Sequence, residues 1–227
     1  LEGSQVIRQL PEKNVLIVSN HQTYFADVVA MFHVFNASLS GRIDSIKNIG
    51  YLWRPKLNIY FVAAKETMKA GFLPRILAYA GSVSIERTWR EKGLDVNRKV
   101  KMSDISNIGM ALNDGWVITF PQGTTTPFKP LRKGTAYIIK RYKPIVVPIV
   151  IDGFRRSFDK KGIRIKKRGI LQSMEIKAPL KIDYENESVE SIMKKIEYAI
   201  EQHPSFLKVI SKDELESEEQ LNKKREW

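Results

Sequence analysis

Asn14–Asp27 reads NVLIVSNHQTYFAD, and the expected fold is built outward from it. The apolar run Val15–Val18 predicts a buried strand. His21 stands where that strand ends, and Asp27 opens a segment whose apolar residues recur with helical spacing. An imidazole can take up a proton near neutral pH, and a carboxylate bonded to its second nitrogen would hold the ring in one tautomer. The stretch therefore predicts a histidine base at the mouth of a strand, supported by an aspartate.

Strand and helix patterns alternate beyond this stretch. Short apolar runs predict further strands at 43–47, 82–85, 116–120, 145–151, 163–165 and 174–176. Helical spacing of apolar residues predicts helices at 72–80, 100–112, 134–141 and 189–202. The alternation predicts an α/β fold, a central β-sheet flanked by helices, with functional groups at the strand ends.

The composition is that of a globular protein. The chain has 227 residues, of which 43% are hydrophobic and 28% charged, enough for one domain with a sizeable core. We expect a single domain over 1–227, with a motif-bearing core at about 14–151, a basic part at 152–210 and a charged tail at 211–227. Because the first residue is Leu1 rather than Met, we expect an N-terminal segment to be missing, and a membrane anchor in it stays open.

The absence of cysteine narrows the chemistry. It excludes disulfides, thiolate metal sites and a cysteine acyl-enzyme. We expect no metal site in this chain.

The charge balance favours an anionic partner. The formal net charge is +13, and residues 155–181 hold ten Lys or Arg against two acids, a local balance of +8. Such a surplus suits an anionic membrane surface, an acidic carrier protein or a nucleic acid. No nucleic acid is expected, because no binding module of that kind is present and aromatic residues do not interleave with the basic run. No apolar run approaches the roughly 18 residues of a membrane-spanning helix.

Four short blocks occur in order along the chain. SNHQTYFAD at 19–27 carries the histidine and the aspartate, and GSVSIER at 81–87 has a glycine, an apolar strand and a terminal arginine. FPQGT follows at 120–124, and IVVPIVI at 145–151 places a proline within an apolar strand. Together they resemble the signature blocks of the glycerolipid acyltransferase family, the lysophosphatidic acid acyltransferase-like enzymes, in which the third block is usually written FPEGT.

The resemblance implies an α/β acyltransferase domain associated with the cytoplasmic face of a membrane. Such an enzyme moves a fatty acyl group to a hydroxyl of a lysolipid such as 1-acylglycerol-3-phosphate, in membrane phospholipid biosynthesis. The donor substrate would be acyl-CoA or an acyl-carrier protein, with no further cofactor. His21 would take the proton of the acceptor hydroxyl, and Asp27 would orient the ring. Arg87 would hold an acidic group of a substrate, and backbone amides near 147–149 are the candidates for the oxyanion.

The third block and the residues after it supply the other substrate contacts that the resemblance implies. Gly123 would let the backbone approach the substrate, and Thr124 would donate its hydroxyl. Gln122 keeps the size and the acceptor oxygen of the usual glutamate but loses its charge. The family's pattern often has an arginine after this block to meet the acceptor phosphate; here Lys129, Arg132 and Lys133 are close enough in sequence to substitute for it.

Three features depart from the family pattern. Five residues separate His21 from Asp27 where four are usual, so the pair meets only if the extra residue bulges out before the helix. Gln122 replaces a glutamate, and Thr125 stands where an arginine often follows. Two alternatives therefore stay open: an acceptor without phosphate, such as an amino-acid lipid, and a catalytically silent lipid-binding relative.

Overall fold

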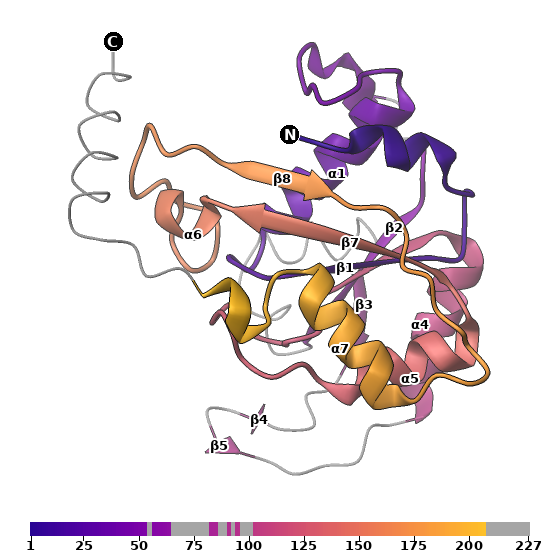
Figure 1. Ribbon diagram of the computed structural model, residues 1–227. Coiled ribbons are helices and arrows are strands. Elements are labelled where there is room, and N and C mark those ends of the chain that lie inside the picture. The colour runs from indigo at the N-terminus through magenta and orange to yellow at the C-terminus, as the bar shows by residue number, and fades with distance from the viewer. Residues whose placement is uncertain (54–55, 65–81, 86–89, 92–93, 96–101, 208–227) are drawn as a thin grey trace.

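The sheet is built around β1, Val15–Ser19, whose five side chains are all buried. Figure 1 shows the computed structural model, which describes residues 1–53, 56–64, 82–85, 90–91, 94–95 and 102–207. β1 lies between β6 (Trp116–Thr119) and β7 (Ile145–Asp152) and runs parallel to both. A parallel strand that is covered on both faces needs a continuous apolar run, and β1 has one.

In the described part of the chain the main sheet has six strands, in the order β3-β2-β6-β1-β7-β8. β2 (Ile59–Ala64) and β3 (Ser82–Ile85) extend its parallel part, and β8 (Ser173–Ile176) closes the other edge antiparallel to β7. β4 (Arg90–Glu91) and β5 (Leu94–Asp95) form a separate antiparallel pair. Since β1, β6 and β7 run the same way, the loops that follow them lie together at the carboxyl ends of these strands.

Helices cover both faces of the sheet (Figure 1). One face carries η1 (Ser4–Gln9) and α1 (Ala26–Leu39); the other carries α4 (Met102–Asp114), α5 (Lys133–Tyr142) and α7 (Val189–Ala199). The short helices η2 (Ile49–Trp53), α6 (Phe154–Ser157) and η3 (Pro204–Phe206) lie in connections. None of the helices in the described ranges is long and apolar enough to cross a membrane. The predicted α/β fold with a central sheet flanked by helices is therefore confirmed.

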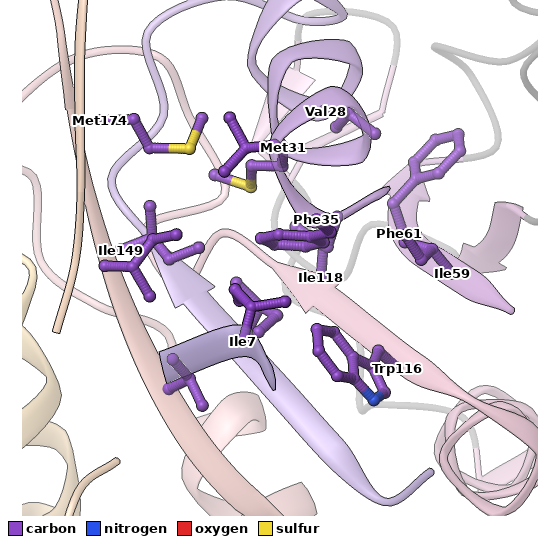
Figure 2. Close-up of a cluster of buried hydrophobic side chains, with 14 of the residues drawn as sticks. Ile7, Val28, Met31, Phe35, Ile59, Phe61, Trp116, Ile118, Ile149 and Met174 are labelled. Carbon is purple, nitrogen blue, oxygen red and sulfur yellow. The ribbon is translucent and has the colours of Figure 1, made fainter. Parts of the chain in front are cut away.

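The two faces of β1 belong to two hydrophobic clusters. Val15 and Ile17 pack with α1 and η1 in the cluster drawn in Figure 2, where the Phe35 and Trp116 rings meet edge to face at 5.6 Å. Leu16 and Val18 lie in the second cluster, beneath α4, α5 and α7. Alternate residues of one apolar run thus fill both sides of the sheet, as the period of a strand requires.

A proline is tolerated in the central strand β7. Pro148 lies opposite Val18 of β1, whereas the pairing with β8 runs only from Ile149 to Asp152. The amide hydrogen that proline lacks therefore falls outside the β8 ladder. The Pro148 carbonyl still accepts from the Lys177 N–H at 3.0 Å.

Two predicted strands are wrong. Residues 43–47 form no strand, and Ile43 and Ile46 are about half exposed, so this stretch has no buried face to hold it in a sheet. Residues 163–165 have irregular backbone, and the isolated bridge between Phe158 and Ile165 is the pairing that remains there. The helix predicted at 72–80 lies outside the described residues.

Candidate active site

His21 and Asp27 form a hydrogen-bonded pair just beyond the carboxyl end of β1. The His21 Nδ1 lies 2.9 Å from the Asp27 Oδ2. The Asp27 side chain is fully buried, whereas the His21 side chain keeps 13% of its surface exposed. An ionised carboxylate can only accept, so Nδ1 carries the proton and donates it. The unprotonated Nε2 is then the nitrogen available to act as a base.

Residues of the β1–α1 loop surround the Asp27 carboxylate with donors. The Gln22 N–H donates to Oδ2 at 2.7 Å, and the Thr23 N–H lies 3.1 Å from both oxygens. The Thr23 hydroxyl donates to Oδ1 at 2.7 Å. These bonds offset the cost of burying a charge, and the position in the first turn of α1 adds a favourable helix dipole. The carboxylate that orients His21 is therefore itself held in place.

The loop absorbs the extra residue of the histidine–aspartate spacing. Helix α1 begins only at Ala26, so the preceding residues are free of helical geometry. The amides of Tyr24 and Phe25 donate to the carbonyls of Lys160 and Lys161, at 3.1 and 3.0 Å. The expectation that the pair survives through a bulge before the helix is confirmed, and the segment after α6 supplies the partners of that bulge.

Phe120 supplies a wall for the His21 ring. The two rings stack with centroids 3.9 Å apart and an interplanar angle of 20°. Phe120 directly follows β6, which pairs in parallel with β1, so the two strand ends bring the rings together. The stack limits the tilt of the imidazole and shields one of its faces from water. Sequence reasoning missed this contact, although both motifs end apolar runs, which was the available signal.

Two amide side chains tie the loop to β7. The Asn20 Oδ1 accepts from the Ile151 N–H at 2.8 Å, and its Nδ2 donates to the Ile151 carbonyl at 2.8 Å. The Gln22 Nε2 donates to the same carbonyl at 3.1 Å, and its Oε1 accepts from the Arg155 N–H at 3.1 Å. A side-chain amide carries a donor and an acceptor, so Asn20 continues the ladder past the end of β1. Neither residue was singled out from the sequence.

Arg155, in α6, brings a positive charge close to the pair. Partial burial lowers the pKa of its guanidinium from the ordinary value, and the negative charge of Asp27 opposes that shift. The two charges are therefore close enough to interact through the protein. Sequence reasoning counted Arg155 only within the basic run. Arg87, the cation it selected, lies outside the described residues.

Gln122 is buried beside the site and is held by its amide nitrogen. The Gln122 Nε2 donates to the Lys129 carbonyl at 3.0 Å and to the Gln202 Oε1 at 3.1 Å, and that oxygen also accepts from the Phe128 N–H at 3.0 Å. Both partners of Nε2 are acceptors, so a glutamate carboxylate here would face two oxygens. The departure from the usual FPEGT block is thereby explained. The Gln122 Oε1 is buried and meets no donor among the described residues.

The remaining predicted contacts fall on the surface around the third block. Gly123 has φ 65°, a left-handed conformation that favours glycine, and the Thr124 hydroxyl meets Thr126. Lys129 is exposed. The Lys133 Nζ lies 2.8 Å from Glu190 of α7, so its ammonium already has a carboxylate partner. This pairing weakens Lys133 as a ligand for a substrate phosphate.

The fourth block does not provide the expected oxyanion site. Val147 and Ile149 are fully buried within β7, opposite Ile17 and Ser19 of β1. Because they lie inside the sheet and in the hydrophobic core, their amides face neighbouring strands instead of an open cleft. The apolar side chains of the fourth block therefore serve to pack the hydrophobic core.

Comparison with known proteins adds to this geometry. A family model described as Acyltransferase matches residues 1–152, more than half of the chain. No curated protein sequence matches. Among solved structures, the chain is similar to the crystal structure of the 1-acyl-sn-glycerophosphate (LPA) acyltransferase, PlsC, from Thermotoga maritima, with a TM-score of 0.51. That match has 20% sequence identity and covers 88% of this chain and 67% of the other, and at this identity it supports the fold alone.

Proposed function

Because the chain belongs to the acyltransferase family, we propose that it moves a fatty acyl group from a thioester to a free hydroxyl of a lysolipid. The donor is acyl-CoA or an acyl-carrier protein, and the acceptor to test first is 1-acylglycerol-3-phosphate. The product is a membrane phospholipid precursor. The site lies at the cytoplasmic face of a membrane.

In this reaction His21 acts as the general base. Its Nε2 removes the proton of the acceptor hydroxyl as that oxygen attacks the thioester carbonyl. The tetrahedral intermediate collapses to an ester, and the leaving thiolate takes the proton back from the imidazolium. No acyl-enzyme is needed, which suits a chain without cysteine. Asp27 stabilises the imidazolium while it exists.

The observation that carries the proposal is the 2.9 Å bond between the His21 Nδ1 and the buried Asp27 carboxylate. It makes Nε2 the basic nitrogen, and Phe120 stacks on the same ring. The longer spacing does not separate the pair, so one ground for a catalytically silent relative falls away. The other ground was Gln122, and its amide nitrogen donates to the Lys129 carbonyl and the Gln202 Oε1, which gives the glutamine a structural role.

A phosphate acceptor is favoured by the charges around the pair. Arg155 lies within electrostatic reach of Asp27, and the exposed Lys129 follows the third block. A guanidinium can meet a phosphate with two parallel hydrogen bonds, which makes Arg155 the first candidate for that contact. An acceptor without phosphate, such as an amino-acid lipid, would offer these cations at most a carboxylate, which carries less negative charge than a phosphate monoester.

Thiol release from one long-chain acyl-CoA tests the proposal, with a panel of lysolipids as acceptors. We expect release only when an acceptor is present, fastest with 1-acylglycerol-3-phosphate, and none above background for His21→Ala. His33→Ala is the matched control, because His33 lies in the same helix as Asp27 and contacts Tyr51 instead of the pair. Full activity of His21→Ala would refute the mechanism. Lipid binding with no release for any acceptor would instead identify a silent relative.

A further inference from the structure

The connection between α6 and β8 exposes apolar and basic side chains together. Ile163, Ile165 and Leu171 are 47%, 62% and 69% exposed. Residues 160–171, named here the basic loop, hold six Lys or Arg and no acid. All six basic side chains are exposed. Large aliphatic side chains that stay in water at such a density call for a partner.

The basic loop has a defined conformation. The Asp159 carboxylate accepts from the Ile163 and Arg164 amides at 2.9 and 3.1 Å, which closes the turn. The Lys166 amide donates to the Ser157 carbonyl at 2.7 Å. At the far end, a Cβ on Gly153 would come within 2.1 Å of the Leu171 carbonyl, so the two backbones touch. The exposed side chains therefore stand on a fixed frame.

The basic loop packs against the loop that carries His21. The carbonyls of Lys160 and Lys161 accept from the β1–α1 loop, and the Lys160 ammonium lies 5.8 Å from the centre of the Tyr24 ring. Gly162, at φ 76°, leaves room for this contact, since a Cβ there would lie 2.6 Å from the Ala26 amide. Anything that binds the basic loop thus binds beside the pair.

We infer that the basic loop docks the protein on an anionic lipid surface. The cations meet the phosphates of the headgroups, and the three aliphatic side chains enter the headgroup boundary between them. Figure 1 shows α6 and its connection to β8 at the end of β7. His21 follows the same end of β1, because β1 runs parallel to β7. A lipid acceptor held in that surface is then next to His21, a consequence that rests on the proposed function. The docking itself does not depend on the proposed function.

A bilayer fits this surface better than an acidic protein or a nucleic acid. Aliphatic side chains that alternate with Lys and Arg have no stacking faces for bases, because the basic loop contains no aromatic residue. An acidic carrier protein would satisfy the cations but leave Ile165 and Leu171 in water. Anionic lipid satisfies both kinds of side chain at once.

Vesicle sedimentation of the full chain, without donor or acceptor, tests the inference. We expect binding to vesicles of phosphatidylglycerol mixed with phosphatidylcholine, and at least tenfold weaker binding to phosphatidylcholine alone. Each basic residue near an anionic surface strengthens binding about fivefold, so Arg164→Gln/Lys166→Gln should weaken it about 25-fold. Ile165→Ser/Leu171→Ser should weaken it about tenfold at unchanged charge.

The matched control removes the same charge elsewhere. Lys13, in the turn before β1, and Lys194, in α7, are exposed, and Lys13→Gln/Lys194→Gln should change binding less than twofold. Equal losses in the control and the basic-loop variant would overturn the inference, as would unchanged binding of the aliphatic variant. Retention by an acidic carrier protein, with no retention by either vesicle, would also overturn it. Acyl transfer is measured separately on detergent-dissolved acceptor, so the two proposals fail independently.

Discussion

Asp27→Asn removes one charge from the site and little else. The Asp27 Oδ2 accepts from the His21 Nδ1, the Gln22 amide and the Thr23 amide, whereas Oδ1 also meets the Thr23 hydroxyl. An asparagine can keep its oxygen in the Oδ2 position and point its amino group at the Thr23 hydroxyl, which rotates to accept. The Thr23 N–H then loses its contact at the Oδ1 position and keeps the one to the oxygen at the Oδ2 position. The His21 tautomer is then preserved. The substitution thus isolates the electrostatic role of the carboxylate.

The expected loss of rate follows from the contact distance. Two unit charges about 3 Å apart interact by about 5 kcal/mol at an effective dielectric constant of about 20, which is an upper bound for what the imidazolium loses. A neutral hydrogen bond in the same place recovers about 1 kcal/mol. We therefore expect the activation free energy to rise by about 3–4 kcal/mol, which lowers kcat by a factor of about 10²–10³. The free energy of unfolding should change by only about 1–2 kcal/mol, because weaker bonds are offset by relief of a buried charge.

Single-turnover thiol release from acyl-CoA measures the chemical step, and thermal unfolding reports stability. Thr23→Val is the matched control, since it removes one donor to the carboxylate while keeping the charge and the Oδ2 contacts. Its activity should stay within about threefold of the original chain. A rate for Asp27→Asn within threefold of the original would refute the reasoning, because the buried charge would then do nothing for the transition state.

Three further changes test other contacts, two beside the pair and one at the amino end of β7. Gln122→Glu places a carboxylate against the Lys129 carbonyl and the Gln202 Oε1 and should cost about 2–3 kcal/mol in urea unfolding, less at acid pH where the protonated acid can donate. Phe120→Ala removes the stack on the imidazole and should lower kcat/KM up to about tenfold at unchanged acceptor selectivity. Burial raises the pKa of the Tyr184 phenol, so its contribution to stability is complete below pH 10 and is lost as pH rises through the folded-state value. Tyr184→Phe should lower the free energy of unfolding by about 1 kcal/mol at neutral pH, because it removes the bond to the Pro144 carbonyl. The difference in unfolding free energy between the two chains should narrow above pH 10.

Elements with a long apolar pattern could be predicted from the sequence. The runs behind β1, β6 and β7 are apolar and contain no charged residue, and buried parallel strands need that pattern, so their positions were correct to within a residue or two. The expected strands at 43–47 and 163–165 failed because short Ile-rich stretches look the same whether they are buried or exposed. Burial is a property of the whole fold, and a five-residue window does not contain it.

The candidate site likewise contains contacts that the sequence could predict and contacts that it could not. The contact between His21 and Asp27 joins residues six apart in the chain, so local spacing was enough to predict it. The contacts of His21 with Phe120 and of Asn20 with Ile151, and the electrostatic interaction of Asp27 with Arg155, each join residues far apart in the chain. They depend on strand order, with β1 between β6 and β7, which alternation alone does not determine.

Two of the three departures from the family pattern, the longer spacing and Gln122, are matched by residues beyond position 152, where the family match ends. The extra residue before α1 is held by the carbonyls of Lys160 and Lys161, and Gln122 is held by Gln202. In both cases the departure supplies the donors and the later segment the acceptors: backbone amides of Tyr24 and Phe25 in the loop, and the side-chain amide of Gln122 in the third block. The part after β7 therefore shapes the site as directly as the blocks do, and the acceptor that this chain prefers should depend on both.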